Sequence, residues 1–166
     1  MTMAAASIFA VLVTLAASFD VLSRRIPNWI NLLLASTFFP LAWASGMSLA
    51  LFIVHAGMGL GLLVMAFFFV SLGFFGSGDG KLLAAAGLWI GPAGLADFLT
   101  WTALVGGVQM LAVLAWSILF WISSRLGSGR KHRSWWPTEK LPYGYAIAAG
   151  ALLALPESWW SSPFSQ

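Results

Sequence analysis

The chain has 166 residues, of which 60% are hydrophobic and 8% are charged, and its formal net charge is +3. A soluble domain carries about 25% charged residues, so a chain this poor in charge cannot cover a water-facing surface. The composition predicts one integral-membrane domain over residues 1–166. The absence of cysteine excludes disulfides, thiolate metal sites and a cysteine nucleophile.

Six apolar segments follow one another along the chain, at residues 3–19, 29–43, 49–75, 82–90, 95–122 and 143–155. Their apolar runs are continuous, which predicts helices, and lipid requires the backbone polar groups to be satisfied within the segment. The first segment follows no basic stretch and ends at an acid, so we expect a retained helix and not a removed signal peptide.

The fourth segment is short for a hydrocarbon core of about 30 Å. It either extends through Pro92, thins the membrane or lies inside the bundle. The sequence therefore predicts an all-α fold, a polytopic membrane helical bundle with about six transmembrane helices.

The basic residues predict the orientation of these spans. All eight fall in three connections that six spans would place on one side: Arg24, Arg25, Lys81, Arg125, Arg130, Lys131, Arg133 and Lys140. Positively charged loops face the cytoplasm, so we expect both termini on the outer side of the membrane. Asp97 and Glu157 would lie on that outer side, where Trp159 and Trp160 are expected to anchor at the interface. The basic segment 127–140 is expected to touch anionic lipid, and no nucleic-acid partner is expected.

The third apolar segment contains small and polar residues of interest. Gly57 and Gly61, with Gly59 between them, predict a close approach of two helices. His55 precedes them, and we expect it to bond to a neighbouring backbone group, because no ligand set accompanies it.

Asp20 is the first candidate for chemistry. It opens the run DVLSRRIPN, residues 20–28, after the first apolar segment. An acid at a membrane edge is costly unless it is paired or functional. Pro27 disfavours helical geometry at Ile26, so the chain should restart as a helix near Asn28. Taken alone, Asp20 is equally well explained as an ion-pair partner of Arg24.

Asp79 is the second candidate, in the run GSGDGK at residues 76–81. The glycines on either side of it allow an unwound backbone and close approach of another chain. Taken alone, Asp79 is equally well explained as the cap of the fourth helix, with Lys81 reaching to the membrane surface. A phosphate-binding loop is excluded, because the Walker spacing is absent and an acid stands where the anion would bind.

Together, the two acids predict a chemistry that neither predicts alone. Both lie at cytoplasmic ends of segments that can pack against each other, whereas Glu139, the other acid on that side, falls in the basic segment. Two carboxylates that share a proton are the machinery of aspartic proteases. One takes a proton from the attacking water, and the other hydrogen-bonds the peptide carbonyl oxygen. This prediction requires no metal and no cofactor.

Three segments resemble the prepilin (leader) peptidase family. Residues 76–79 match the G-x-G-D signature of intramembrane aspartyl proteases, and the longer run FFGSGDGKLLAAAGLWIGP is similar to the prepilin peptidase form of it. The run DVLSRRIPN resembles that family's D-x-x-x-x-x-I-P-N motif. LPYGYAIAAGAL, at residues 141–152, resembles the last helix of its short members. The three occur in the family's order and span most of the chain.

The resemblance implies an aspartic endopeptidase that removes the short basic leader from type IV prepilins, without a metal. It also implies a bacterial inner-membrane protein, with the cut at the cytoplasmic face and both termini then periplasmic. The expected partners are the prepilin, with its leader and apolar helix, and membrane lipid. The implied catalytic residues are Asp20 and Asp79. The residues implied to shape the site are Gly76, Gly78, Lys81, Pro27 and Asn28, and those implied to lie beside the substrate are Pro142, Tyr143 and Gly144. Long members also N-methylate the product and carry an extra N-terminal segment; this chain resembles the short type of Flp (tight-adherence) pili, so a peptidase without methyltransferase activity is expected.

Three alternatives stay open at this point. A small transporter or channel would use intramembrane acids as an ion path, at the membrane midplane. A catalytically inactive assembly partner would share the fold. A metal enzyme would hold Mg²⁺ between two carboxylates, but the sequence offers no further cluster of oxygen ligands.

Overall fold

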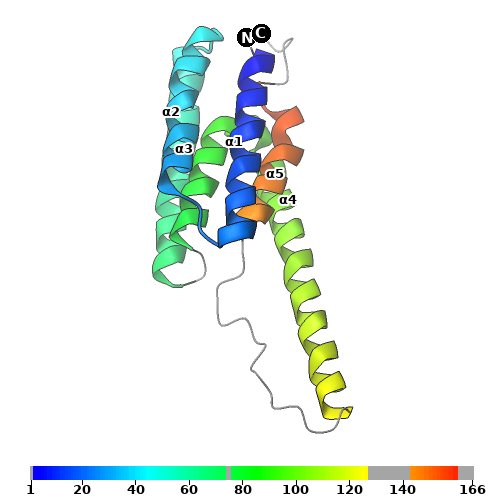
Figure 1. The fold of residues 1–166 in the computed structure, drawn as a ribbon. Coiled ribbons are helices and arrows are strands. Elements are labelled where there is room, and N and C mark those ends of the chain that lie inside the picture. The colour runs from blue at the N-terminus through cyan, green and yellow to red at the C-terminus, as the bar shows by residue number, and fades with distance from the viewer. Residues whose placement is uncertain (1, 74–75, 127–142, 161–166) are drawn as a thin grey trace.

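The computed structural model describes residues 2–73, 76–126 and 143–160, and every element in these ranges is a helix (Figure 1). The elements are α1 (Thr2–Ser23), α2 (Asn28–Ala44), α3 (Leu49–Ser71), α4 (Ser77–Leu126), α5 (Gly144–Ala154) and the short 3₁₀ helix η1 (Leu155–Glu157). The predicted all-α class is confirmed. By length and composition, α1, α3 and α4 can cross a membrane; the number of spans stays a prediction.

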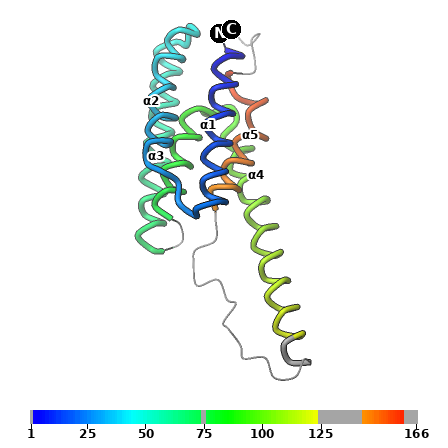
Figure 2. Tube along the Cα trace, in the orientation of Figure 1, coloured from blue at the N-terminus to red at the C-terminus, as the bar shows by residue number. Residues whose placement is uncertain are grey.

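Helix α4 consists of two arms that meet at Gly91. There the backbone leaves helical geometry, with φ 69° and ψ −169°, and Pro92 begins the second arm. The first arm runs antiparallel to α3, because Gly80 faces Ala66 and Gly87 faces Leu62. The second arm runs antiparallel to α5, which brings Gly150 against Thr102. Figure 2 shows the chain turning over between the two arms, behind α1.

The first arm of α4 contains the short fourth apolar segment. Of residues 79–91, all but Lys81 are buried. The structure thus selects one of the three explanations for the short segment, because it lies inside the bundle and is covered by its neighbours instead of facing lipid.

A buried pair of tryptophans connects the first arm of α4 to α2 and to the C-terminal residues that follow η1. The Trp89 indole N–H donates to the Leu34 carbonyl over 2.7 Å, and the Trp160 indole N–H donates to the Trp89 carbonyl, also over 2.7 Å. The rings of Trp89 and Trp160 lie 4.9 Å apart. The prediction that Trp160 anchors at the membrane interface is wrong, since its ring is fully buried and its polar atom is satisfied inside the protein.

His55 lies on α3 where the two arms of α4 meet. Its Nδ1 lies 2.8 Å from the Leu88 carbonyl oxygen, as expected of a histidine that bonds to a backbone group. Its ring occupies the space that a side chain at Gly91 would need.

The predicted close approach of helices occurs, but at a different glycine. A Cβ at Gly59 would lie 2.9 Å from the Leu88 Cβ, whereas among the described residues nothing lies within 4 Å of one at Gly57 or Gly61. Residues four apart share a helix face, and a residue midway between them points to the opposite face. Gly57 and Gly61, the predicted pair, lie on the exposed face of α3, whereas Gly59 lies on the buried face and makes the close contact.

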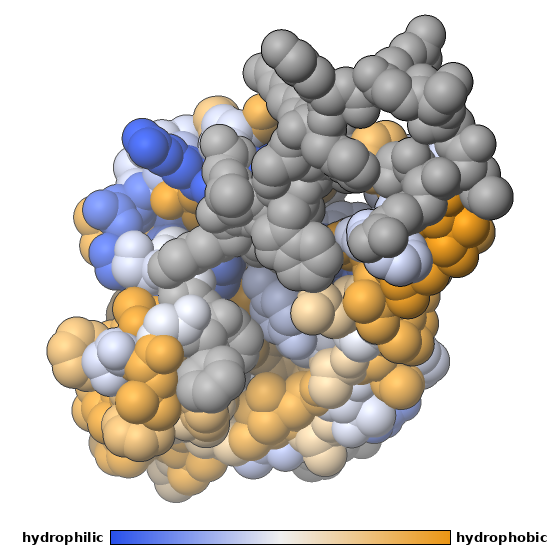
Figure 3. Space-filling model, turned by 90° about the horizontal axis from the view of Figure 1, so that it is seen from below, coloured by the Kyte–Doolittle hydropathy of each residue, from blue (hydrophilic) through white to orange (hydrophobic). Residues whose placement is uncertain are grey.

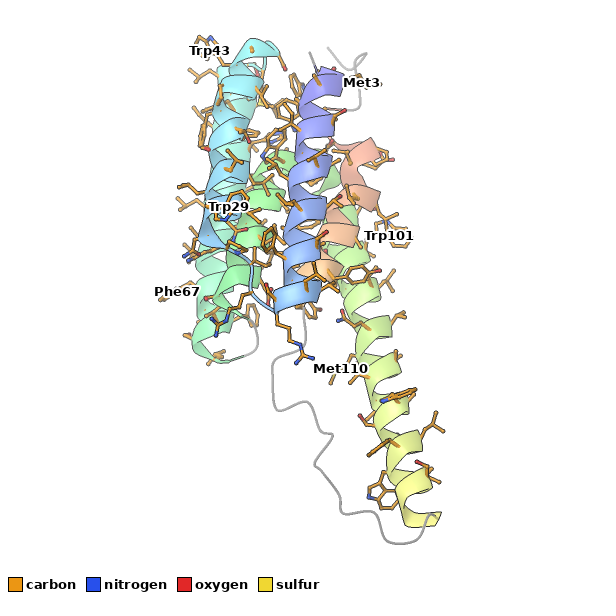
Figure 4. The ribbon with its side chains drawn as sticks, in the orientation of Figure 1. Met3, Trp29, Trp43, Phe67, Trp101 and Met110 are labelled. Carbon is orange, nitrogen blue, oxygen red and sulfur yellow. The ribbon has the colours of Figure 1, made fainter. Side chains whose placement is uncertain are left out.

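The two ends of the bundle differ. The start of α1 lies at the same end as η1 (Figure 1), and Asp97 and Glu157 are exposed there. The opposite end, where α1 finishes and α2, α4 and α5 begin, is called the site end below. Large apolar side chains such as Trp43 and Phe67 are exposed on the outside of the bundle (Figure 4), a surface suited to lipid and not to water.

Candidate active site

Asp20 lies in the last turn of α1, and only 3% of it is exposed. Its Oδ2 accepts the backbone N–H of Tyr145 over 3.2 Å, so the carboxylate of one helix caps the N-terminus of another, α5. Exposed N–H groups and the helix dipole favour a negative charge at that position. A Cβ at Gly144 would lie 2.8 Å from the same oxygen, so glycine is what allows the carboxylate to come so close.

Asp79 lies in the first turn of α4 and is 8% exposed. Its Oδ2 accepts the backbone N–H of Gly76 over 3.2 Å, and the Gly80 N–H donates to the Gly76 carbonyl over 3.1 Å. This is the acid half of a capping box, so the expected capping role is confirmed. Capping does not exclude a further role, because an ionised carboxylate can accept about four hydrogen bonds.

Ile26 joins the two acidic segments. It lies in the extended connection that follows Arg24, which adopts a left-handed φ of 53° after the end of α1. A Cβ at Gly78 would lie 3.3 Å from the Ile26 Cβ, and one at Gly144 would lie 2.6 Å from the Ile26 Cδ1. One buried side chain therefore packs against both glycine-containing helix starts, and the sequence motifs meet around it.

A cavity of about 180 Å³ opens beside Asp79. Tyr143, which directly precedes α5, and Ile147 of α5 line it together with Asp79. Both acids thus face the start of α5: Asp20 through its hydrogen bond to Tyr145, and Asp79 across this cavity.

A family model for the type IV leader peptidase family matches residues 7–120. The chain belongs to the type IV leader peptidase family. The matched stretch contains Asp20, Asp79 and the connection around Ile26. No curated protein and no solved structure matches the chain. The family makes this protein a leader peptidase-like protease of the membrane.

In this leader peptidase, the residues around the acids tie α2 to α4. Pro27 precedes the first residue of α2 in extended geometry, with ψ 137°. The exposed Lys81 ammonium donates to the Asn28 side-chain oxygen over 2.8 Å. One turn along α2, the buried Asn31 donates its amide to the Gly78 carbonyl over 3.3 Å. The sequence analysis missed Asn31, although a lone amide in an apolar helix is a usable signal.

A larger groove of about 700 Å³ lies between α2 and α3, over the first arm of α4. Its walls are apolar except at the site end, where Asn28, Asn31 and Lys81 line it. Figure 3 views the protein from the site end, where the hydrophilic surface gathers on one side. Arg24, Arg25 and Lys81 are exposed at this end, so these three basic residues lie on one side as expected; the cytoplasmic orientation of that side stays a prediction.

Some predicted features of the leader peptidase lie outside the described residues: Pro142, Glu139 and the basic segment 127–140. Within the described ranges, no group of three or more histidine, aspartate or glutamate side chains is arranged to hold a metal ion.

Proposed function

We propose that this leader peptidase is an aspartic endopeptidase in which Asp20 and Asp79 are the catalytic residues. The observation that carries the proposal is the burial of two carboxylates from distant parts of the chain at one end of the bundle, both facing the start of α5. Its substrate is a type IV prepilin of the Flp type, cut at the cytoplasmic face of the bacterial inner membrane.

In the proposed reaction, the ionised carboxylate takes a proton from water while the water oxygen attacks the scissile carbonyl carbon. The other carboxyl group, protonated, donates a hydrogen bond to the carbonyl oxygen. When the tetrahedral intermediate collapses, the C–N bond breaks and the leaving nitrogen takes a proton from a carboxyl group. The products are the leader, with a new carboxylate, and the mature pilin, with a new amine.

The alternative of an ion path is less well supported by the positions of these acids. A path across the membrane needs ionisable groups near its middle. Asp20 occupies the last turn of its helix and Asp79 the first turn of its own, which suits a substrate that is cut at the membrane surface.

The test is to co-express a Flp-type prepilin with wild type, Asp20→Asn, Asp79→Asn and the control Asp97→Asn, and to follow precursor size. Asp97 is an exposed acid of α4 at the opposite end from the site. We expect each site variant to reach the membrane at the wild-type level and to stop processing, while the Asp97 variant processes normally. Near-normal processing by either site variant removes that residue from the catalytic pair.

A further inference from the structure

The cavity beside Asp79 extends from the site end into the membrane-spanning part of the protein. Leu83 lines it one turn beyond Asp79 along α4, and Ile147 lines it one turn beyond Tyr143 along α5. Both helices begin at the site end and run away from it. The cavity therefore leads inward from the proposed scissile bond.

The cavity also reaches the lipid-facing surface. Leu83 and Ile147 in its wall are 5% and 2% exposed, whereas Met65 and Leu99 in the same wall are 39% and 37% exposed. A substrate helix that lies in the membrane can thus place a side chain in the cavity from the side, without first crossing water.

Size and lining define what the cavity can hold. A cavity of about 150 Å³ lined by leucine, isoleucine and phenylalanine takes up benzene, so about 180 Å³ accommodates one side chain the size of leucine, methionine or phenylalanine. The polar residues of its described lining are Asp79, Thr102 and Tyr143, and the rest are apolar or glycine. Such a wall favours an apolar side chain over a polar one.

We propose that this cavity is the specificity pocket for the substrate residue that immediately follows the scissile bond. The inference rests on the proposed function, in which the leader stays at the cytoplasmic surface and the mature segment continues into the membrane. In that reaction, the residue on the membrane side of the cut is the first one past Asp79, and the cavity that Asp79 lines extends in the same direction. The protein selects there for one apolar side chain of limited size.

The test changes the volume of the cavity in both directions. Ala103→Leu fills it and Leu99→Ala enlarges it, since both residues line it from the second arm of α4. Ala96→Leu and Leu104→Ala are the matched controls: both positions are exposed on the same helix, outside the cavity wall. Precursors with alanine, leucine or tryptophan directly after the scissile bond compete in the same membranes, so each ratio of cleavage rates is independent of the amount of enzyme.

We expect wild type to favour leucine over alanine, and Ala103→Leu to reduce that ratio about 10-fold, because one or a few methylene groups change selectivity by this order. Leu99→Ala should raise the tryptophan-to-leucine ratio by a similar factor. Either shift, absent from its control, supports the pocket. If wild type cleaves the precursors but both ratios match the controls, the pocket assignment is overturned and the proposed function stands. If wild type cleaves none of them, the proposed function fails as well.

Discussion

Replacement of Gly144 by alanine tests the geometry of the site most directly. The added Cβ would lie 2.6 Å from the Ile26 Cδ1 and 2.8 Å from the Asp20 Oδ2. To reach ordinary contact at about 3.4 Å, the carboxylate must retreat by about 0.6 Å. Because the backbone of Gly144 is helical, and not in the left-handed region, the substitution introduces no backbone strain.

The expected magnitude follows from two opposed effects. Alanine in place of glycine favours a helix by up to about 1 kcal/mol, whereas overpacking a close contact costs about 1–3 kcal/mol. With the full helix-propensity gain, the net effect on the free energy of unfolding should be a loss of about 0–2 kcal/mol. Processing should fall further, by about 10-fold to 100-fold, because a misplacement of about 1 Å costs an enzyme about 100-fold in rate.

Two measurements separate these effects: precursor processing in membranes and thermal stability of the purified protein in detergent. Gly107→Ala is the matched control, since among the described residues nothing lies within 4 Å of a Cβ there. It should leave processing unchanged and raise stability by up to about 1 kcal/mol, because only the helix-propensity gain applies. Adding Ile26→Val to Gly144→Ala removes the clashing Cδ1 and should recover stability in part but not processing, because the contact with Asp20 persists. Wild-type processing by Gly144→Ala would refute the assignment of this contact to the site.

Three further outcomes are expected. Trp89→Phe loses the hydrogen bond to Leu34 and should lower the thermal stability of the purified protein by about 1–3 kcal/mol, whereas Trp101→Phe, at a half-exposed position, should change it little. Lys81→Met removes the hydrogen bond to Asn28 and should slow processing more than Lys81→Arg, with stability altered by less than about 1 kcal/mol in either variant, because the ammonium is exposed. Treatment of membranes with EDTA should leave processing unchanged, since the proposed reaction uses carboxyl groups alone; a loss that Mg²⁺ restores would contradict it.

The sequence was most informative at the helix ends, where proline, glycine and acidic residues interrupt the apolar segments. The proline at position 27 predicted where α2 begins, and Asp79 predicted the capped start of α4. The unwound backbone that the glycines around Asp79 would allow is not found, because residues 77–80 are helical. Acids, prolines and glycines stand out against an apolar background, because each has a cost in lipid that the fold or the function must offset. The segment order and the two acidic residues were readable for this reason.

Packing inside the bundle was much less readable. In a soluble helix, apolar periodicity marks the buried face. Helix α3 is apolar on all sides, because its outer face meets lipid and its inner face meets protein. The sequence could therefore not distinguish Gly59 from Gly57 and Gly61, and the same ambiguity placed Trp160 at an interface instead of in the core.

Ile26 connects the motifs that could be recognised in the sequence with the packing that could not be predicted from it. The sequence marked Ile26 only as the residue before Pro27, with no contact for its side chain. In the structure it packs against Gly78 and Gly144, while Asp20 in the last turn of α1 caps α5 and Asn28 begins α2. A side chain larger than hydrogen at either glycine would push Ile26 away from one helix start or the other. Gly78 and Gly144 thus share Ile26 as a contact partner. The fixed spacing from Asp20 to Ile26 brings the carboxylate of α1 to the start of α5 while the same connection meets α4.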